Sequence, residues 1–219
     1  MFVGHYGVSF AIKRRDPAVP LWVLFIAVQW LDVMWAPLVL LGIEKVRIVP
    51  GITATNPLDL FYMPFTHSLV AAILWSIGAF ILYRIAVRGA SATSAGLVAI
   101  AVFSHWALDF IVHRPDLPLY DDTAKVGLGL WNAPVLAFGL ETLLFFGGMW
   151  LYFRTGVARR RAMIVFGVVM LIAHALVFFG APPTSPNAAA ISALAAYVVF
   201  AFVIWLLERK PPLVHEARS

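Results

Sequence analysis

Hydrophobic residues gather in long uninterrupted stretches along this chain, separated mostly by short polar linkers. A helix that crosses the hydrocarbon core of a bilayer needs roughly 20 apolar residues. The stretches of this length lie at about 20–43, 64–83, 92–113, 131–153, 162–180 and 188–207. Because an isolated span in lipid must satisfy its own backbone groups, this pattern predicts an all-α polytopic membrane protein with about six transmembrane helices. We expect a single transmembrane domain over residues 1–219, since no internal repeat or soluble domain interrupts the pattern.

The first residues form a separate element. Residues 2–12 are apolar but too few to span, and the basic cluster Lys13–Arg15 follows them. Asp16 and Pro17 then break the chain before the stretch at 20–43, which is too long for a signal peptide and has no small-residue cleavage site. One interpretation is a half-helix that begins inside the membrane domain and packs on protein. The other is an amphipathic helix that lies on the membrane surface.

Composition supports the membrane class and limits the chemistry. Residues are 62% hydrophobic and 12% charged, whereas soluble domains carry about 25% charged residues. The absence of cysteine excludes disulfides, thiolate metal sites and cysteine nucleophiles, so any metal site must use His, Asp and Glu. The net charge is +5, but no basic stripe with interleaved aromatic residues appears, and we expect no nucleic-acid partner.

The distribution of Lys and Arg predicts the orientation. Cytoplasmic loops of membrane proteins carry an excess of these residues. With the N-terminus inside, the cytoplasmic residues are Lys13, Arg14, Arg15, Arg84, Arg88, Arg154, Arg159, Arg160, Arg161, Arg209, Lys210 and Arg218. The external residues are only Lys45, Arg47, Arg114 and Lys125. We therefore expect a multi-pass protein of the inner or plasma membrane with both termini in the cytosol.

Several ionisable side chains fall within the predicted spans, where they are costly and indicate a functional site. They are Asp32, His67, His105, Asp109, Glu141 and His174. At a rise of 1.5 Å per residue, they lie roughly 18–26 Å from the cytoplasmic ends of their helices. On the half-helix interpretation, His5 lies roughly 12 Å from the cytoplasmic end of that helix. Most of these residues therefore share one layer in the outer half of the bilayer.

The spacing of His105 and Asp109 is the sharpest local pattern. Residues four apart lie one turn apart on the same helical face, so this imidazole and carboxylate could bind one Zn²⁺ or similar ion. His113 continues that face by another turn. A His–Asp hydrogen bond that joins two helices is the alternative. His67 could be an interfacial histidine instead of a ligand, and Asp32 could be a neutral acid bonded to a neighbour.

Two further residues have less specific patterns. Glu141 is a candidate general base, or a partner that orients a ligating histidine, and a neutral structural acid is equally compatible with its position. His174 stands alone between Ala173 and Ala175, which is typical of a packing histidine.

Four motifs occur in a characteristic order: Gly4-His5, Asp32 in the first long stretch, Phe65-Thr66-His67-Ser68, and Ser104-His105 followed by Asp109. This order resembles the YdjM-type family of membrane-bound metal-dependent hydrolases over roughly residues 1–120. Those proteins carry a GH pair, an LPDxDH-like stretch, a GFTHS block and an SHxxxD helix.

The resemblance implies metal-ligand roles, residue by residue, for His5, Asp32, His67, His105 and Asp109. It also favours the half-helix, which brings His5 near Asp32. The family's second acid and following histidine are absent here, because Asp32 precedes Val33, Met34 and Trp35. This departure implies either one ion where relatives hold two, or a site without activity.

The function expected from these patterns is a metal-dependent hydrolase. One or two divalent ions, Zn²⁺ first among them, would activate water, and Glu141 or His113 would shuttle the proton. The depth of the site suggests a lipid or lipid-linked substrate, which could be a phosphoester, drawn from the membrane lipids. The main alternative is a transporter or channel for a metal ion or proton that uses the same cluster. Haem ligation by His105 and His174, or a non-catalytic scaffold, are further alternatives.

Overall fold

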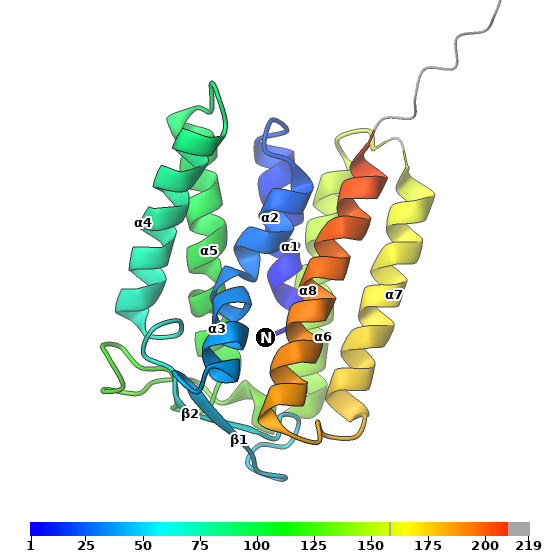
Figure 1. Cartoon of the computed structure of the whole chain (residues 1–219). Helices are drawn as coiled ribbons and strands as arrows, with labels where there is room; N and C mark the ends of the chain where they lie inside the picture. Colours follow the sequence, from blue (N-terminus) through cyan, green and yellow to red (C-terminus); the bar gives the residue numbers. More distant parts are fainter. Residues whose placement is uncertain (158, 210–219) are drawn as a thin grey trace, which may run out of the picture.

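The computed structural model describes residues 1–157 and 159–209. Within them the chain forms eight α-helices, one short 3-10 helix and a two-stranded sheet (Figure 1). In chain order these are α1 (Val3–Arg15), α2 (Leu21–Val28), α3 (Trp30–Leu40), β1 (Lys45–Ile48), β2 (Leu58–Tyr62), α4 (Leu69–Ala86), α5 (Ala92–Val112), η1 (Leu130–Asn132), α6 (Pro134–Phe153), α7 (Arg160–Phe179) and α8 (Pro186–Glu208).

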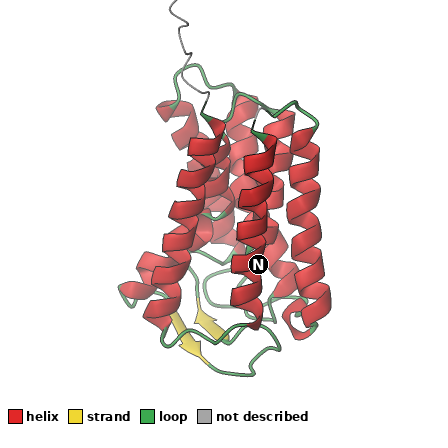
Figure 2. Ribbon diagram, turned by 90° about the vertical axis from the view of Figure 1, so that its right-hand side faces the viewer, coloured by secondary structure: helices red, strands yellow, loops and turns green. Residues whose placement is uncertain are grey.

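The all-α membrane architecture is confirmed. In the described part of the chain, α4, α5, α6, α7 and α8 are each long and apolar enough to cross a membrane. The pair α2 and α3 passes the same test as a sixth span, although it is bent by 53°. The helices run roughly along one bundle axis, with the small sheet at one end of the bundle (Figure 2).

The expectation of one continuous helix over 20–43 is wrong. The helix breaks at the buried Gln29, which ends α2 and begins α3 with φ −107° and ψ 9°. The Gln29 Nε2 group donates a 3.1 Å hydrogen bond to the carbonyl of Phe2. The break therefore lies where α1 begins, and it redirects α3 at the depth of Asp32.

Helix α1 is a buried half-helix, which confirms that interpretation of the N-terminal segment. It begins inside the bundle and runs to the end opposite the sheet (Figure 1). Its closest neighbour is α6, where the backbones of Gly7 and Gly148 approach so closely that a Cβ on either would lie 2.1–2.2 Å from a carbonyl oxygen. The helix also continues through Lys13–Arg15 instead of ending at residue 12. Basic residues in a last helical turn favour this continuation, because they oppose the negative end of the helix dipole.

The linker at 44–63 folds into a β-hairpin that hydrophobic periodicity does not indicate. β1 and β2 pair antiparallel, with Lys45 opposite Tyr62 and Arg47 opposite Asp59. As a result, α4 begins at Leu69, about five residues later than the predicted 64, and its N-cap Ser68 accepts a bond from Ala71 N. Likewise, the helix predicted from 131 begins at Pro134, after η1.

The basic residues collect at the end of the bundle opposite the hairpin. The α1–α2, α4–α5 and α6–α7 connections all lie at that end, at the top of Figure 1. These connections and the helix ends beside them carry the Lys13–Arg15 cluster, Arg88 and Arg154, among others. Lys210 and Arg218, which also entered the charge count, lie outside the described residues.

Candidate metal centre

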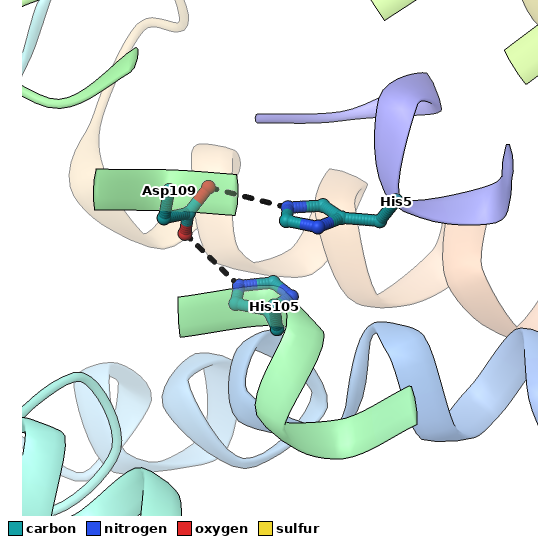
Figure 3. A group of neighbouring side chains, drawn as sticks. All are labelled: His5, His105 and Asp109. Atoms are coloured by element: carbon teal, nitrogen blue, oxygen red, sulfur yellow. Dashed lines mark ion pairs between the residues drawn. The ribbon is translucent and has the colours of Figure 1, made fainter. Parts of the chain in front are cut away.

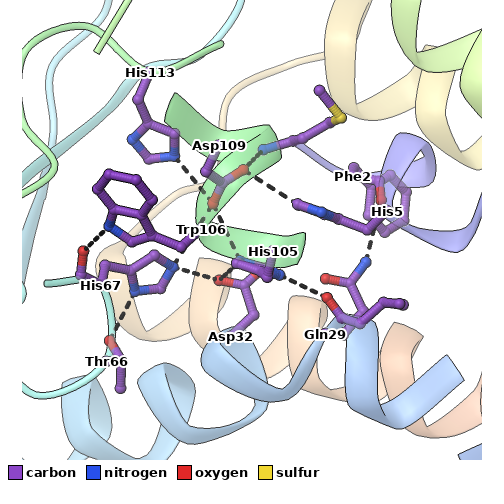
Figure 4. Close-up of polar contacts among 12 residues, drawn as sticks. Phe2, His5, Gln29, Asp32, Thr66, His67, His105, Trp106, Asp109 and His113 are labelled. Atoms are coloured by element: carbon purple, nitrogen blue, oxygen red, sulfur yellow. Dashed lines mark hydrogen bonds and ion pairs between the residues drawn. The ribbon is translucent and has the colours of Figure 1, made fainter. Parts of the chain in front are cut away.

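The five predicted ligands converge at one place in the bundle (Figure 4). His5 comes from α1, Asp32 from α3, His105 and Asp109 from α5, and His67 from the turn before α4. The three histidines and Asp109 are buried, and the side chain of Asp32 is 18% exposed. Four segments that are distant in sequence thus bring imidazole nitrogens and carboxylate oxygens together.

Three of these side chains form one compact group, His5, His105 and Asp109 (Figure 3). The Nε2 atoms of His5 and His105 lie 3.2 Å and 3.1 Å from the two oxygens of Asp109. The two imidazole rings stack, with centroids 4.0 Å apart and planes within 8°. His105 and Asp109 lie one turn apart on the same face of α5, as their spacing predicted, and α1 adds His5 as the third side chain.

Asp32, His67 and His105 form a second group, which shares His105 with the first. Asp32 Oδ1 lies 3.3 Å from His67 Nε2 and 3.7 Å from His105 Nε2. The other Asp32 oxygen accepts a 2.6 Å hydrogen bond from the hydroxyl of Tyr197 on α8. The two overlapping groups offer positions for one or two ions.

These contacts have distances that suit ion ligation as well as hydrogen bonding. Within the described residues, the buried Nε2 atoms of His5 and His105 have no hydrogen-bond partner, although each lies close to Asp109. Two ligand atoms that each lie about 2.1 Å from one ion in tetrahedral geometry are about 3.4 Å apart. The Met1 ammonium group also forms an ion pair with Asp109, so this carboxylate does accept a cation.

Outer contacts orient two of the imidazoles. His105 Nδ1 lies 2.8 Å from the carbonyl of Val28 (Figure 4). A carbonyl only accepts, so Nδ1 carries a proton, and in the neutral imidazole the Nε2 lone pair then faces the cluster. The same arrangement is typical of metal-binding histidines.

His67 is oriented through a hydroxyl. The Thr66 hydroxyl donates a 2.7 Å bond to Glu44 Oε2 and lies 2.7 Å from His67 Nδ1. Glu44 Oε1 accepts from the backbone N–H groups of Phe65 and Thr66, both at 2.9 Å. With Glu44 ionised, the Thr66 proton is used on Glu44, so a neutral His67 donates from Nδ1 to Thr66 and keeps the Nε2 lone pair towards Asp32.

Glu44 is a functional residue that sequence reasoning missed. Burial raises the pKa of its carboxyl group, against the opposing effects of His67 and of the hydrogen bonds that it accepts from Thr66 and Phe65. An acidic residue directly after the end of the predicted span at 20–43 is the only signal in the sequence, and nothing in the linker indicates its partner. Its pairing with Thr66 arises only when the hairpin brings the two ends of the linker together.

His113 lies at the edge of the cluster. Its Nδ1 is 2.9 Å from Asp116 Oδ1 and its Nε2 is 3.5 Å from Asp109 Oδ2. Burial lowers the pKa of His113, but the Asp109 and Asp116 carboxylates outweigh burial and raise it to about 9. The two carboxylates thus draw positive charge to this imidazole, which either a proton or a metal ion supplies.

Glu141 is linked to the cluster through the backbone of α1, which carries His5. Its Oε2 accepts hydrogen bonds from the backbone N–H groups of Phe2 (2.6 Å) and Gly4 (3.3 Å), so it caps the buried start of α1. Its other oxygen has no hydrogen-bond partner within the described residues. His174 lies outside the cluster and stacks on Phe138, with ring centroids 4.9 Å apart.

A cavity of about 640 Å³ adjoins the cluster on the side of the hairpin. Asp32, His67, Asp109, His113 and Glu141 line it together with mostly apolar residues from the hairpin loop, α7 and α8. Of the described residues that line it, none is Lys or Arg. The cavity can therefore bring an apolar molecule to the carboxylates and imidazoles.

Comparison of the chain with protein-family models, curated proteins and solved structures finds no match.

Proposed function

We propose that this protein is a membrane-embedded metal-dependent hydrolase. The observation that carries the proposal is the convergence of oriented imidazole lone pairs and two carboxylates beside a cavity. Such a donor set suits Zn²⁺ and similar divalent ions. A bound ion of this kind supplies Lewis acidity and lowers the pKa of water towards 7.

The side chains around the ion have distinct tasks in this proposal. His5, His105 and Asp109 hold one position, and Asp32 and His67 extend it towards a second. Glu141 lines the cavity with a carboxylate oxygen that is free of hydrogen bonds within the described residues, so it is suited to accept a proton. His113, which Asp116 orients, is the other candidate for proton transfer.

The surroundings favour a lipid or lipid-linked substrate, with phosphoesters among the bonds to be tested. The cluster lies within the spanning part of the bundle, and the cavity beside it is lined mainly by apolar side chains. On the charge distribution, we place the hairpin end outside and both termini in the cytosol of an inner or plasma membrane.

An ion or proton pathway is less well supported. A pathway must continue from the cluster to the opposite end of the bundle with polar groups along it. Between the cluster and the basic end, the described core instead contains large buried apolar side chains, including Phe10, Phe25, Phe145 and Met149. The cluster has an approach from the hairpin side and an apolar barrier on the other side.

Elemental analysis of the detergent-purified protein tests the proposal. We expect about one or two equivalents of zinc or another transition metal in the wild type, and loss of the metal in His105→Ala and Asp32→Asn. His174→Phe is the matched control, because it removes a buried histidine that is outside the cluster and keeps an aromatic ring. A wild type without metal, even after incubation with Zn²⁺ or Mn²⁺, would overturn the proposal.

A further inference from the structure

The cavity extends sideways between two helices that pack on different parts of the bundle. α7 packs on α6 and α1, whereas α8 packs on α2 and α3. Both helices line the cavity, α7 with Leu176 and Val177, and α8 with Ala189, Ala193 and Ala196. Apart from Tyr197, the α8 side of this opening is therefore made of small residues, which leave room beside the larger α7 side chains.

An aromatic layer closes this opening on the side of the basic end. The ring of Phe2 lies 6.0 Å from that of His174 on α7 and 6.3 Å and 6.0 Å from those of Tyr197 and Phe200 on α8. Phe2 thus lines the cavity on the side of the basic end and fills the space between α7 and α8 there. At the other end, the cavity is lined by Gly180–Pro183 of the α7–α8 connection and by the hairpin loop residues Pro50, Gly51 and Thr53–Pro57.

The remaining side of the opening faces the membrane. Leu176 and Val177 line the cavity and are also 66% and 65% exposed on the outer surface of the bundle. They lie in a helix that is long and apolar enough to span a bilayer, so lipid chains are the medium outside them. The walls of the opening on α7 and α8 are mostly apolar, so an apolar occupant suits the place where it passes between the helices.

We propose that a hydrocarbon chain of a lipid from the surrounding bilayer enters the cavity between α7 and α8, on the hairpin side of Phe2. This inference rests on the proposed function, since it identifies the substrate as a membrane lipid that reaches the cluster laterally. The Asp32–Tyr197 hydrogen bond joins the cluster to the α8 wall of the opening. The bond to be hydrolysed therefore lies beside Asp32, and the chain extends outwards past Ala193 and Leu176.

Photo-crosslinking of the full-length protein tests this position. The protein is reconstituted in vesicles of phosphatidylethanolamine and phosphatidylglycerol that include a phospholipid with a diazirine in its acyl chain. We expect crosslinks within the segments 176–183 and 189–196. Ala193→Trp on one wall and Leu176→Trp on the other should each reduce crosslinking at the opposite wall about tenfold, because either ring occupies space that the chain needs.

Val198→Trp is the matched control, because Val198 is exposed on α8 and does not line the cavity. Metal content is measured in every variant, so the two proposals fail separately. Metal-loaded protein whose cavity crosslinks are absent, or unchanged in both tryptophan variants, would overturn lateral lipid entry and leave the metal centre standing. Metal-free protein would overturn the hydrolase, whatever its crosslinking pattern.

Discussion

At the scale of single residues, the proposed metal centre depends on hydrogen bonds that the ligands make with neighbouring side chains, because these decide which imidazole nitrogen carries the proton. Glu44 accepts the Thr66 hydroxyl proton, so that hydroxyl can only accept from His67 Nδ1. In Glu44→Gln, an amide NH2 group facing Thr66 would donate to its hydroxyl oxygen, and the hydroxyl would then donate to Nδ1. The proton of His67 would move to Nε2 and block the lone pair that faces Asp32.

We therefore predict that Glu44→Gln and Thr66→Val weaken metal binding about 10–100-fold, the usual effect of losing a partner that orients a ligand. The zinc dissociation constant, measured by competition with a chelator, checks this prediction. Thr142→Val is the matched control, because the Thr142 hydroxyl has no hydrogen-bond partner within the described residues. Unchanged zinc affinity in both test variants would show that Glu44 does not orient His67.

The sequence predicted the cluster better than its surroundings. The cost of ionisable residues in apolar stretches pointed to the residues of the cluster but also to Glu141 and His174, and helical spacing paired positions 105 and 109. The resemblance to a hydrolase family then narrowed the ligand set to His5, Asp32, His67, His105 and Asp109. The partners in the outer contacts could not be found. Glu44 and Tyr197 reach the site through tertiary packing, and neither lies at a fixed spacing from its partner in the chain.

At the scale of helices and strands, hydrophobic runs predicted most spans to within a few residues because length and apolarity determine what can cross a bilayer. They did not predict the break at Gln29. At this break, the Gln29 side chain donates a hydrogen bond to the carbonyl of Phe2. The hydrophobic runs did not predict the hairpin either, because its strands are short and a nine-residue loop separates them.

The contact between α1 and α6 depends on two glycines, and substitution of one should displace the half-helix. A Cβ at Gly148 would lie 2.1 Å from the Gly7 carbonyl oxygen, whereas a Cβ at Gly147 would meet nothing within 4 Å. We predict that Gly148→Ala destabilises the fold by about 1–3 kcal/mol, the usual cost of overpacking. Because α1 carries His5, the variant should also bind metal less tightly.

Gly147→Ala is the internal control for this prediction. It adds the same methyl group one residue away and should be neutral or stabilising by about 1 kcal/mol, since Ala favours a helix interior over Gly. Thermal unfolding in detergent, followed by circular dichroism, measures both variants, and elemental analysis reports their metal content. Equal melting temperatures would contradict the close approach of α1 and α6.

At the scale of the whole molecule, the two ends of the bundle differ in how their positive charges are balanced. At the hairpin end, Arg47 and Arg114 both pair with Asp59, and Lys125 pairs with Asp122. The other end collects most of the basic residues of the described chain around its connecting turns. By the positive-inside rule we predict that this basic end faces the cytosol, which would place the proposed metal centre and its cavity in the outer half of the membrane.

The absence of cysteine makes this orientation directly testable. Thr123→Cys adds an exposed thiol near the hairpin end, and Thr155→Cys adds one at the α6–α7 turn of the basic end. In intact cells, a membrane-impermeant maleimide should label the first variant at once and the second only after the membrane is permeabilised. The cysteine-free wild type controls for background labelling. The reverse pattern would place the cavity in the half of the membrane that faces the cytosol, and its lipids would then have to come from the inner leaflet.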